Sequence, residues 1–311
     1  MMPRLKTQAA KESLLRRVRR QRLKYITILP SLITILNGVC GFAAIVFASK
    51  GAAAGLGQFS YLAIGGYMIL LAMIADMLDG RVARMSRSTS SFGGQLDSLC
   101  DIISFGVAPA FLMLKVLEHK LAGFAEFSTA LENLLRRFIW LAAAAYISCA
   151  AIRLARFNVE NEEDESAHMS FIGLPTPAAA GVIVSLIIFH QETLPELSAK
   201  NTYAYLICEN AIIYSLPFIV LGVAVLMVSR IRYPHILNQY IKGKKPFAHF
   251  IRALLGIGLI IWSRQAALVL IFCGFAASGF TKWFYYKILG SYFAKNRRVG
   301  APQEEQSCPV N

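Results

Sequence analysis

The sequence from Asp76 to Asp101 reads DMLDGRVARMSRSTSSFGGQLDSLCD and joins two strongly apolar segments. Asp76 and Asp79 are three residues apart in it. Asp97 and Asp101 are four residues apart. On a helix, these spacings place both members of a pair on one face. An acidic side chain inside a membrane costs about 2.5–3.5 kcal/mol on insertion scales, so four acids together require neutralisation by positive charge.

The composition around this stretch is that of a membrane protein. The 311-residue chain is 56% hydrophobic and only 16% charged, whereas soluble domains carry about 25% charged residues. Eight segments are long or apolar enough to predict membrane spans. They lie near residues 26–49, 61–79, 96–117, 138–157, 173–190, 211–229, 253–262 and 266–289. The seventh is short, and we expect a tight hairpin with the eighth, with one re-entrant element as the alternative. The predicted fold is therefore all-α, a polytopic membrane bundle of about eight transmembrane helices.

The lysines and arginines separate between the two sides of the predicted membrane. With the N-terminus in the cytoplasm, 25 of the 32 basic residues fall in cytoplasmic segments. This positive-inside pattern places both termini and the aspartates in the cytoplasm. It also accounts for the net charge of +14 without a nucleic-acid partner. Within the basic head, residues 11–25 predict an amphipathic helix on the anionic membrane surface, with a solvated tail as the alternative.

These patterns divide the chain into three parts. Residues 1–25 form a basic juxtamembrane segment, residues 26–290 a membrane domain, and residues 291–311 a polar cytoplasmic tail. We expect an integral multi-pass protein of a bacterial cytoplasmic (inner) membrane, and an internal eukaryotic membrane is the alternative.

The two aspartate pairs are expected to face each other across a helical hairpin whose turn covers residues 80–95. Facing carboxylates form a hard oxygen site that suits Mg²⁺, Mn²⁺ or Ca²⁺. Two such ions can clamp a phosphate and a leaving oxygen during displacement at phosphorus. Arg84 lies at the same depth and could contact a phosphate through two nitrogens. Salt bridges within the membrane are the alternative, but Arg81 and Arg84 are too few to neutralise four acids.

The whole pattern, DxxDGxxAR followed after eight residues by GxxxDxxxD, resembles the signature of the CDP-alcohol phosphatidyltransferases. The resemblance implies an all-helical membrane enzyme, usually a homodimer. Such an enzyme transfers a phosphatidyl group from a CDP-activated lipid to an alcohol in phospholipid biosynthesis and releases CMP. It also implies a pair of divalent cations, Mg²⁺ or Mn²⁺ with Ca²⁺ as a further candidate. The implied ligands are Asp76, Asp79, Asp97 and Asp101, with Asp101 also acting as the general base.

The same resemblance implies contacts to the CDP-lipid. Within the motif, the candidate contacts are Gly80, Ala83, Arg84, Ser90 and Gly93. The family often carries Pro-Asn before a threonine at the start of the first span. Here that position reads Pro30-Ser31, with Thr34 and Asn37 following, and Ser31 and Thr34 are further candidates.

The acceptor alcohol is predicted from two other stretches, IRLARFNV at residues 152–159 and FIGLPTPAAAG at residues 171–181. Both resemble the phosphatidylserine synthase branch, which implies CDP-diacylglycerol and L-serine as substrates. An arginine beside the metal site suits the free carboxylate of serine, and the candidates are Arg153, Arg156 and Asn158. Alternatively, the two arginines only hold their helix at the lipid headgroups.

Two other functions remain open from the sequence. The same chemistry could use glycerol 3-phosphate, inositol phosphate or choline as the acceptor. A cation-coupled transporter, which belongs to a different class, could use the aspartates as a relay.

Overall fold

The computed structural model describes residues 31–51, 59–86, 91–121, 129–163, 171–198, 201–233 and 263–299. Within these ranges the regular secondary structure is helical, apart from one antiparallel pair of two-residue strands, β1 (Phe171–Ile172) and β2 (Arg232–Tyr233). Seven helical segments of the described chain are long and apolar enough to cross a membrane. The protein is therefore an integral multi-pass helical protein, as predicted. The expected span at residues 253–262 and the expected surface helix before residue 26 lie outside the described residues.

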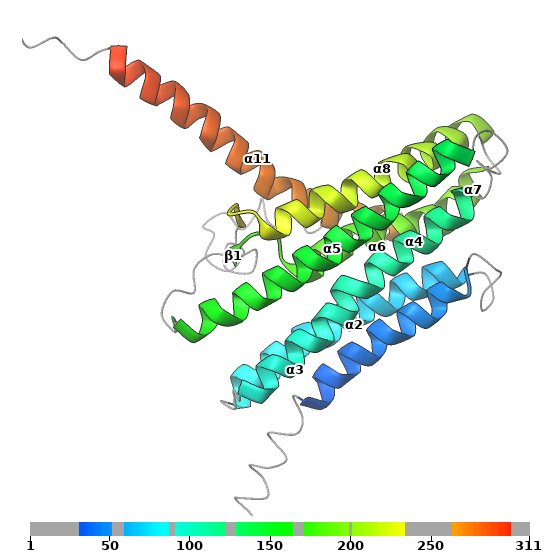
Figure 1. The fold of residues 1–311 in the computed structure, drawn as a ribbon, viewed down its shortest axis with the longest axis horizontal. Helices are drawn as coiled ribbons and strands as arrows, with labels where there is room; N and C mark the ends of the chain where they lie inside the picture. The colour runs from blue at the N-terminus through cyan, green and yellow to red at the C-terminus, as the bar shows by residue number, and fades with distance from the viewer. Residues whose placement is uncertain are drawn as a thin grey trace, which may run out of the picture.

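Most helices lie side by side in one bundle (Figure 1). The first described helix covers Ser31–Ser49. The helical elements that follow are α2 (Tyr61–Ser86), α3 (Ser91–Asp101), the π-helix η1 (Ile102–Val107), α4 (Ala108–Leu121), α5 (Thr129–Glu163), α6 (Thr176–Ile188), the π-helix η3 (Phe189–Thr193), α7 (Leu194–Ser198), α8 (Thr202–Val228) and α11 (Arg264–Val299). The C-terminal part of α11 leaves the bundle (Figure 1).

Several expected boundaries differ from the structure, including the starts of α5 at Thr129, expected at 138, and of α8 at Thr202, expected at 211. Helix α2 continues to Ser86, so Gly80 is helical and not part of a turn over residues 80–95. Gly93 is likewise helical, inside α3. At the other end, α11 runs to Val299, past the expected end of the last span at residue 289. The reason is that SYFAKNRRV at residues 291–299 contains no proline or glycine.

Helix α6 occupies the centre of the bundle, where it contacts α2, α4, α8 and α11. Nearly all of its residues are buried. Its sequence, TPAAAGVIVSLII, is apolar on all sides, as expected of a helix surrounded by others. A Cβ added at Gly181 would lie 2.2 Å from the ring of Phe272 in α11. The small residue therefore permits the close approach of these two helices.

A short strap, residues 171–175, leads into α6 and is bound to the end of α8. The Gly173 amide donates to the Ile231 carbonyl at 2.8 Å, and the Leu174 amide donates to the Leu226 carbonyl at 3.0 Å. Gly173 has φ +81°, a conformation that glycine adopts readily. Beside the strap, Tyr233 donates to the Ala276 carbonyl of α11 at 3.2 Å. Burial raises the pKa of Tyr233 to about 12, so its hydroxyl stays protonated. The strap therefore fixes where α6 begins.

Candidate active site

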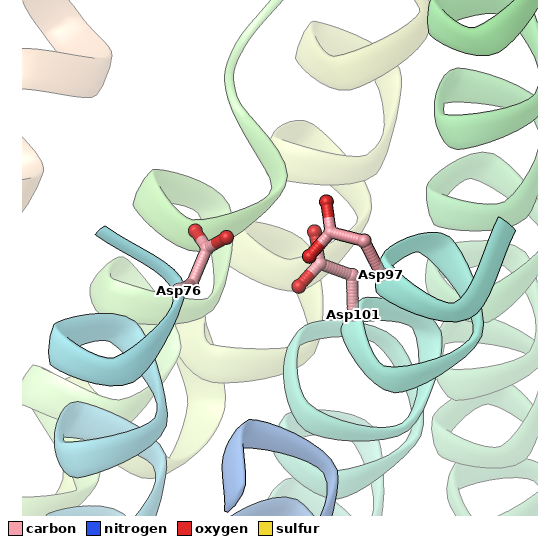
Figure 2. Close-up of side chains that lie close together, drawn as sticks. All are labelled: Asp76, Asp97 and Asp101. Atoms are coloured by element: carbon pink, nitrogen blue, oxygen red, sulfur yellow. The ribbon is translucent and has the colours of Figure 1, made fainter. Parts of the chain in front are cut away.

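Three carboxylates from two helices meet at one end of the bundle. Asp97 and Asp101 lie one turn apart on α3, and their carboxylates face that of Asp76 on α2 (Figure 2). One oxygen from each of the three lies within 4.8 Å of the others. Asp101 is buried, whereas Asp76 and Asp97 are partly exposed. The predicted meeting of the α2 and α3 acids is thus present in the fold.

The fourth aspartate of the motif is turned toward a different helix. Thr34 of the first helix donates its hydroxyl hydrogen to Oδ2 of Asp79. Asp79 is buried, and its other oxygen, Oδ1, has no hydrogen-bond partner within the described part of the chain. Asp79 is not one of the three acids that cluster within 4.8 Å.

Asn37, which the sequence did not single out as a site residue, contacts the cluster. Its side-chain Nδ2 donates to Oδ1 of Asp101 at 2.8 Å. It lies three residues after Thr34, hence on the same side of the first helix. This repeat of polar residues within an apolar span was the available sequence signal.

The residues present fit a divalent cation. Three carboxylates packed this closely at the end of an apolar bundle repel one another, and cations relieve that repulsion. All three offer hard oxygen ligands, which Mg²⁺, Mn²⁺ and Ca²⁺ prefer. The buried Oδ1 of Asp79, which lacks a hydrogen-bond partner among the described residues, is a further oxygen that could be satisfied by a cation. The cluster of Asp76, Asp97 and Asp101 could therefore hold a metal ion.

Arg153 of α5 contacts the start of α6. Its Nη1 donates to Oγ1 of Thr176, the first residue of α6, at 2.7 Å. Its charge is also close enough to Asp101 to interact with that carboxylate electrostatically. Thr176 is fully buried. The guanidinium therefore contacts the start of the central helix and interacts electrostatically with one acid of the cluster.

Asn158 and Arg156 lie further along α5. Asn158 exchanges hydrogen bonds with the Ser98 hydroxyl, as donor at 2.9 Å and as acceptor at 3.2 Å. Because Ser98 follows Asp97, this pair ties α5 to the helix that bears the acids. Arg156 lies one turn beyond Arg153 on the same helix.

The candidate CDP-lipid contacts lie around the same end of the bundle. Ser31 lies in the first described helix, and Thr34 contacts Asp79. Gly80 is exposed, and a Cβ added there would meet nothing within 4 Å. Ala83 and Arg84 belong to α2, but their side chains lie outside the described part of the structure, as does all of Ser90.

The fold and the site define a multi-pass helical membrane protein with a cluster of acids that could hold a metal ion, and comparison with known proteins gives the family. Residues 27–228 match the model of the CDP-alcohol phosphatidyltransferase family. The chain is 32% identical over 222 residues to the CDP-diacylglycerol–serine O-phosphatidyltransferase of Helicobacter pylori, covering 71% of this chain and 80% of that protein. It is 33% identical over 216 residues to the protein of the same name from Methanocaldococcus jannaschii, covering 70% and 78%.

The chain therefore belongs to the CDP-alcohol phosphatidyltransferase family. It is a transferase of phospholipid biosynthesis with CDP-alcohol phosphatidyltransferase activity. The family implies CDP-diacylglycerol and an alcohol as the two substrates. A yeast relative from Saccharomyces cerevisiae, also a CDP-diacylglycerol–serine O-phosphatidyltransferase, is 35% identical over 159 residues, covering 50% of this chain and 51% of that protein.

Proposed function

We propose that this enzyme transfers the phosphatidyl group of CDP-diacylglycerol to the hydroxyl of L-serine, giving phosphatidylserine and CMP. The hydrogen bond of Arg153 to Thr176 and its electrostatic interaction with Asp101 are the observations that support the choice of serine. The relatives from Helicobacter pylori, Methanocaldococcus jannaschii and Saccharomyces cerevisiae are named for the same acceptor. Membership of the family counts against a cation-coupled transporter.

Arg153 offers a receptor for the carboxylate of serine. A guanidinium presents paired N–H donors that match a carboxylate in a bidentate contact. One of its nitrogens is held by Thr176, which limits the orientations of the group. Serine carries a carboxylate two bonds from its hydroxyl-bearing carbon, so an acceptor bound at Arg153 places its hydroxyl near Asp101. Choline has no anionic group for such a contact.

The reaction is a single displacement at phosphorus. The serine oxygen forms a bond to the phosphatidyl phosphorus, and the bond from that phosphorus to the bridging pyrophosphate oxygen breaks. The bridging oxygen and its electron pair leave with CMP. Asp101 accepts the proton of the serine hydroxyl as general base. Divalent cations, when bound, would supply positive charge to the pyrophosphate and the departing oxygen. We propose Asp76, Asp79, Asp97 and Asp101 as the residues that hold them, two ions per site.

The remaining side chains bind and orient the lipid. We propose that Ser31, Gly80, Ala83, Arg84, Ser90 and Gly93 line the path of the CDP moiety. Gly80 is exposed on α2 with open space beside it, which leaves room for a nucleotide. Thr34, by contrast, already donates to Asp79, which supports a role in holding that acid.

An acceptor panel tests the proposal. The purified enzyme in detergent is supplied with CDP-diacylglycerol and, in turn, L-serine, glycerol 3-phosphate, inositol phosphate, choline or ethanolamine. CMP release and the lipid product are measured for each. We expect turnover with L-serine and little with ethanolamine, which is serine without its carboxylate. Faster turnover with another acceptor of the panel would overturn the choice of serine while leaving the family activity intact.

The Arg153→Lys variant tests the carboxylate contact itself. Lysine keeps the charge but loses the paired donors. We expect the KM for serine to rise by about tenfold or more, the equivalent of roughly 1.4 kcal/mol. The KM for CDP-diacylglycerol should change far less. Equal increases in both KM values would contradict a contact to the acceptor.

The orientation in the membrane and the oligomeric state are also proposals. We propose that the acid cluster and both termini face the cytoplasm of a bacterial inner membrane, which the distribution of Lys and Arg supports. Accessibility labelling of single introduced cysteines tests this orientation.

The homodimer implied by the family resemblance is tested by crosslinking in native membranes.

A further inference from the structure

We propose that Asn37 is a positioning residue for Asp101. Its side-chain amide holds one carboxylate oxygen and thereby orients the carboxylate toward Asp76 and Asp97. The inference rests on the proposed function only in placing Asp101 in the reaction.

The first helix reaches Asp101 because two glycines let it approach α3 and η1 closely. A Cβ added at Gly41 would lie 2.6 Å from the Cα of Ser104. A Cβ added at Gly38 would lie 3.0 Å from the Sγ of Cys100. Any larger residue at Gly41 would push the two backbones apart. The short amide of Asn37 can therefore span the gap to Asp101 only with these glycines in place.

A second hydrogen bond runs in the opposite direction across the same contact. The Ser104 hydroxyl donates to the backbone carbonyl of Asn37 at 2.9 Å. Ser104 belongs to η1, the π-helix that begins directly after Asp101. Asn37 and Ser104 are both fully buried. π-Helical turns often occur at functional sites, and here the turn helps to fix the residue that faces the buried acid.

The chemistry of the contact favours one orientation of Asn37. An N–H group that donates to an ionised carboxylate makes a charge-assisted hydrogen bond, which is stronger than a neutral one. The reverse orientation of the amide would bring two acceptor oxygens together. Thr34 makes the corresponding contact to Asp79 from the same side of the helix. The first helix therefore orients one acid from α2 and one from α3.

The test is the Asn37→Leu variant, which removes the donor and keeps a similar volume. Purified protein in detergent is assayed for CMP release, and its Mn²⁺ affinity is measured by electron paramagnetic resonance. Loss of a residue that orients a metal-ligating side chain typically lowers metal affinity or activity by about 10–100-fold. We expect such a fall in kcat and a weaker Mn²⁺ affinity, with little change in the KM of either substrate.

Two further variants keep the test decisive. Ser104→Ala removes only the hydroxyl that holds Asn37, so we expect a smaller loss of kcat and Mn²⁺ affinity. This variant serves as the test if Asn37→Leu fails to fold. Leu36→Ala is the matched control, because Leu36 neighbours Asn37 but is 52% exposed, and it should behave like the unmodified protein.

Two results would overturn the proposal. One is a folded Asn37→Leu protein, or Ser104→Ala protein where the first does not fold, with unchanged kcat and Mn²⁺ affinity. The other is a selective rise in the acceptor KM with unchanged Mn²⁺ affinity, because Asn37 would then contact the acceptor. If the unmodified enzyme released no CMP from CDP-diacylglycerol, the proposed function would fail. Weaker Mn²⁺ binding by Asn37→Leu would still support the positioning role.

Discussion

At the scale of single residues, Asp101 is the side chain on which the proposed chemistry depends most. It is buried, it accepts a hydrogen bond from Asn37, and it interacts electrostatically with Arg153. Asp101→Asn keeps the shape of the side chain and an oxygen that can accept from Asn37, but it removes the base. General base catalysis contributes about 10²–10⁴-fold to rate, and CMP release should fall by that order while the melting temperature stays close to wild type. Glu196→Gln, an exposed acid on α7, is the control. Near-normal turnover by folded Asp101→Asn would show that another group takes the proton.

The clustered carboxylates lead to a second prediction at this scale, which does not depend on turnover alone. A cation that binds only the folded state stabilises it, by about 2.7 kcal/mol at one hundred times its Kd. Mn²⁺ or Mg²⁺ should therefore raise the melting temperature of the chelator-treated protein and restore its CMP release. Asp97→Ala should abolish the thermal shift. Full activity after exhaustive chelation would contradict a metal-dependent site.

At the scale of elements, the strap before α6 determines where Thr176 meets Arg153. A Cβ at Gly173 would lie 2.3 Å from the Met227 carbonyl oxygen, and φ at this position is +81°. Gly173→Ala should therefore displace the strap, lower the melting temperature and raise the KM for the acceptor. Gly222→Ala in α8 is the matched control, since a Cβ there meets nothing within 4 Å. Equal behaviour of the two variants would show that the strap does not govern the acceptor site.

At the scale of the whole molecule, a second polar junction ties the bundle together away from the acids. Glu192 of η3 accepts hydrogen bonds from the Tyr67 hydroxyl of α2 and the Gln265 amide of α11, both at 2.7 Å. Tyr67 precedes Asp76 by nine residues, or about 13 Å along the helix. Glu192→Ala leaves two donors without their acceptor and should lower stability by about 1–3 kcal/mol. CMP release per folded molecule should be unchanged, as measured by thermal unfolding and by assay of the same preparation. Lost turnover at unchanged stability would link this junction to the active site.

Much of the fold could be predicted because local amino-acid composition identifies membrane spans. The existence of α2 and α8 follows from apolar length alone, but their bounds do not, because the expected spans were 61–79 and 211–229. The ends were harder to place, because α2 and α11 continue through polar residues that favour helix as well as loops. In the candidate site, the meeting of Asp76 with Asp97 and Asp101 followed from helix spacing and a hairpin. Asn37 was noted after Thr34 but was assigned no role, because an asparagine in an apolar span has no partner visible in the sequence.

The sequence by itself determined which segments are apolar enough to span a membrane and which acids share a helix face, because both depend on residues within a few turns of one another. Only the tertiary structure decided that Thr34 meets Asp79, that Asn37 meets Asp101 and that Arg153 meets Thr176. These contacts join positions 45, 64 and 23 residues apart. Whether they form depends on how closely whole helices pack, which small residues such as Gly41 allow and no local pattern reveals.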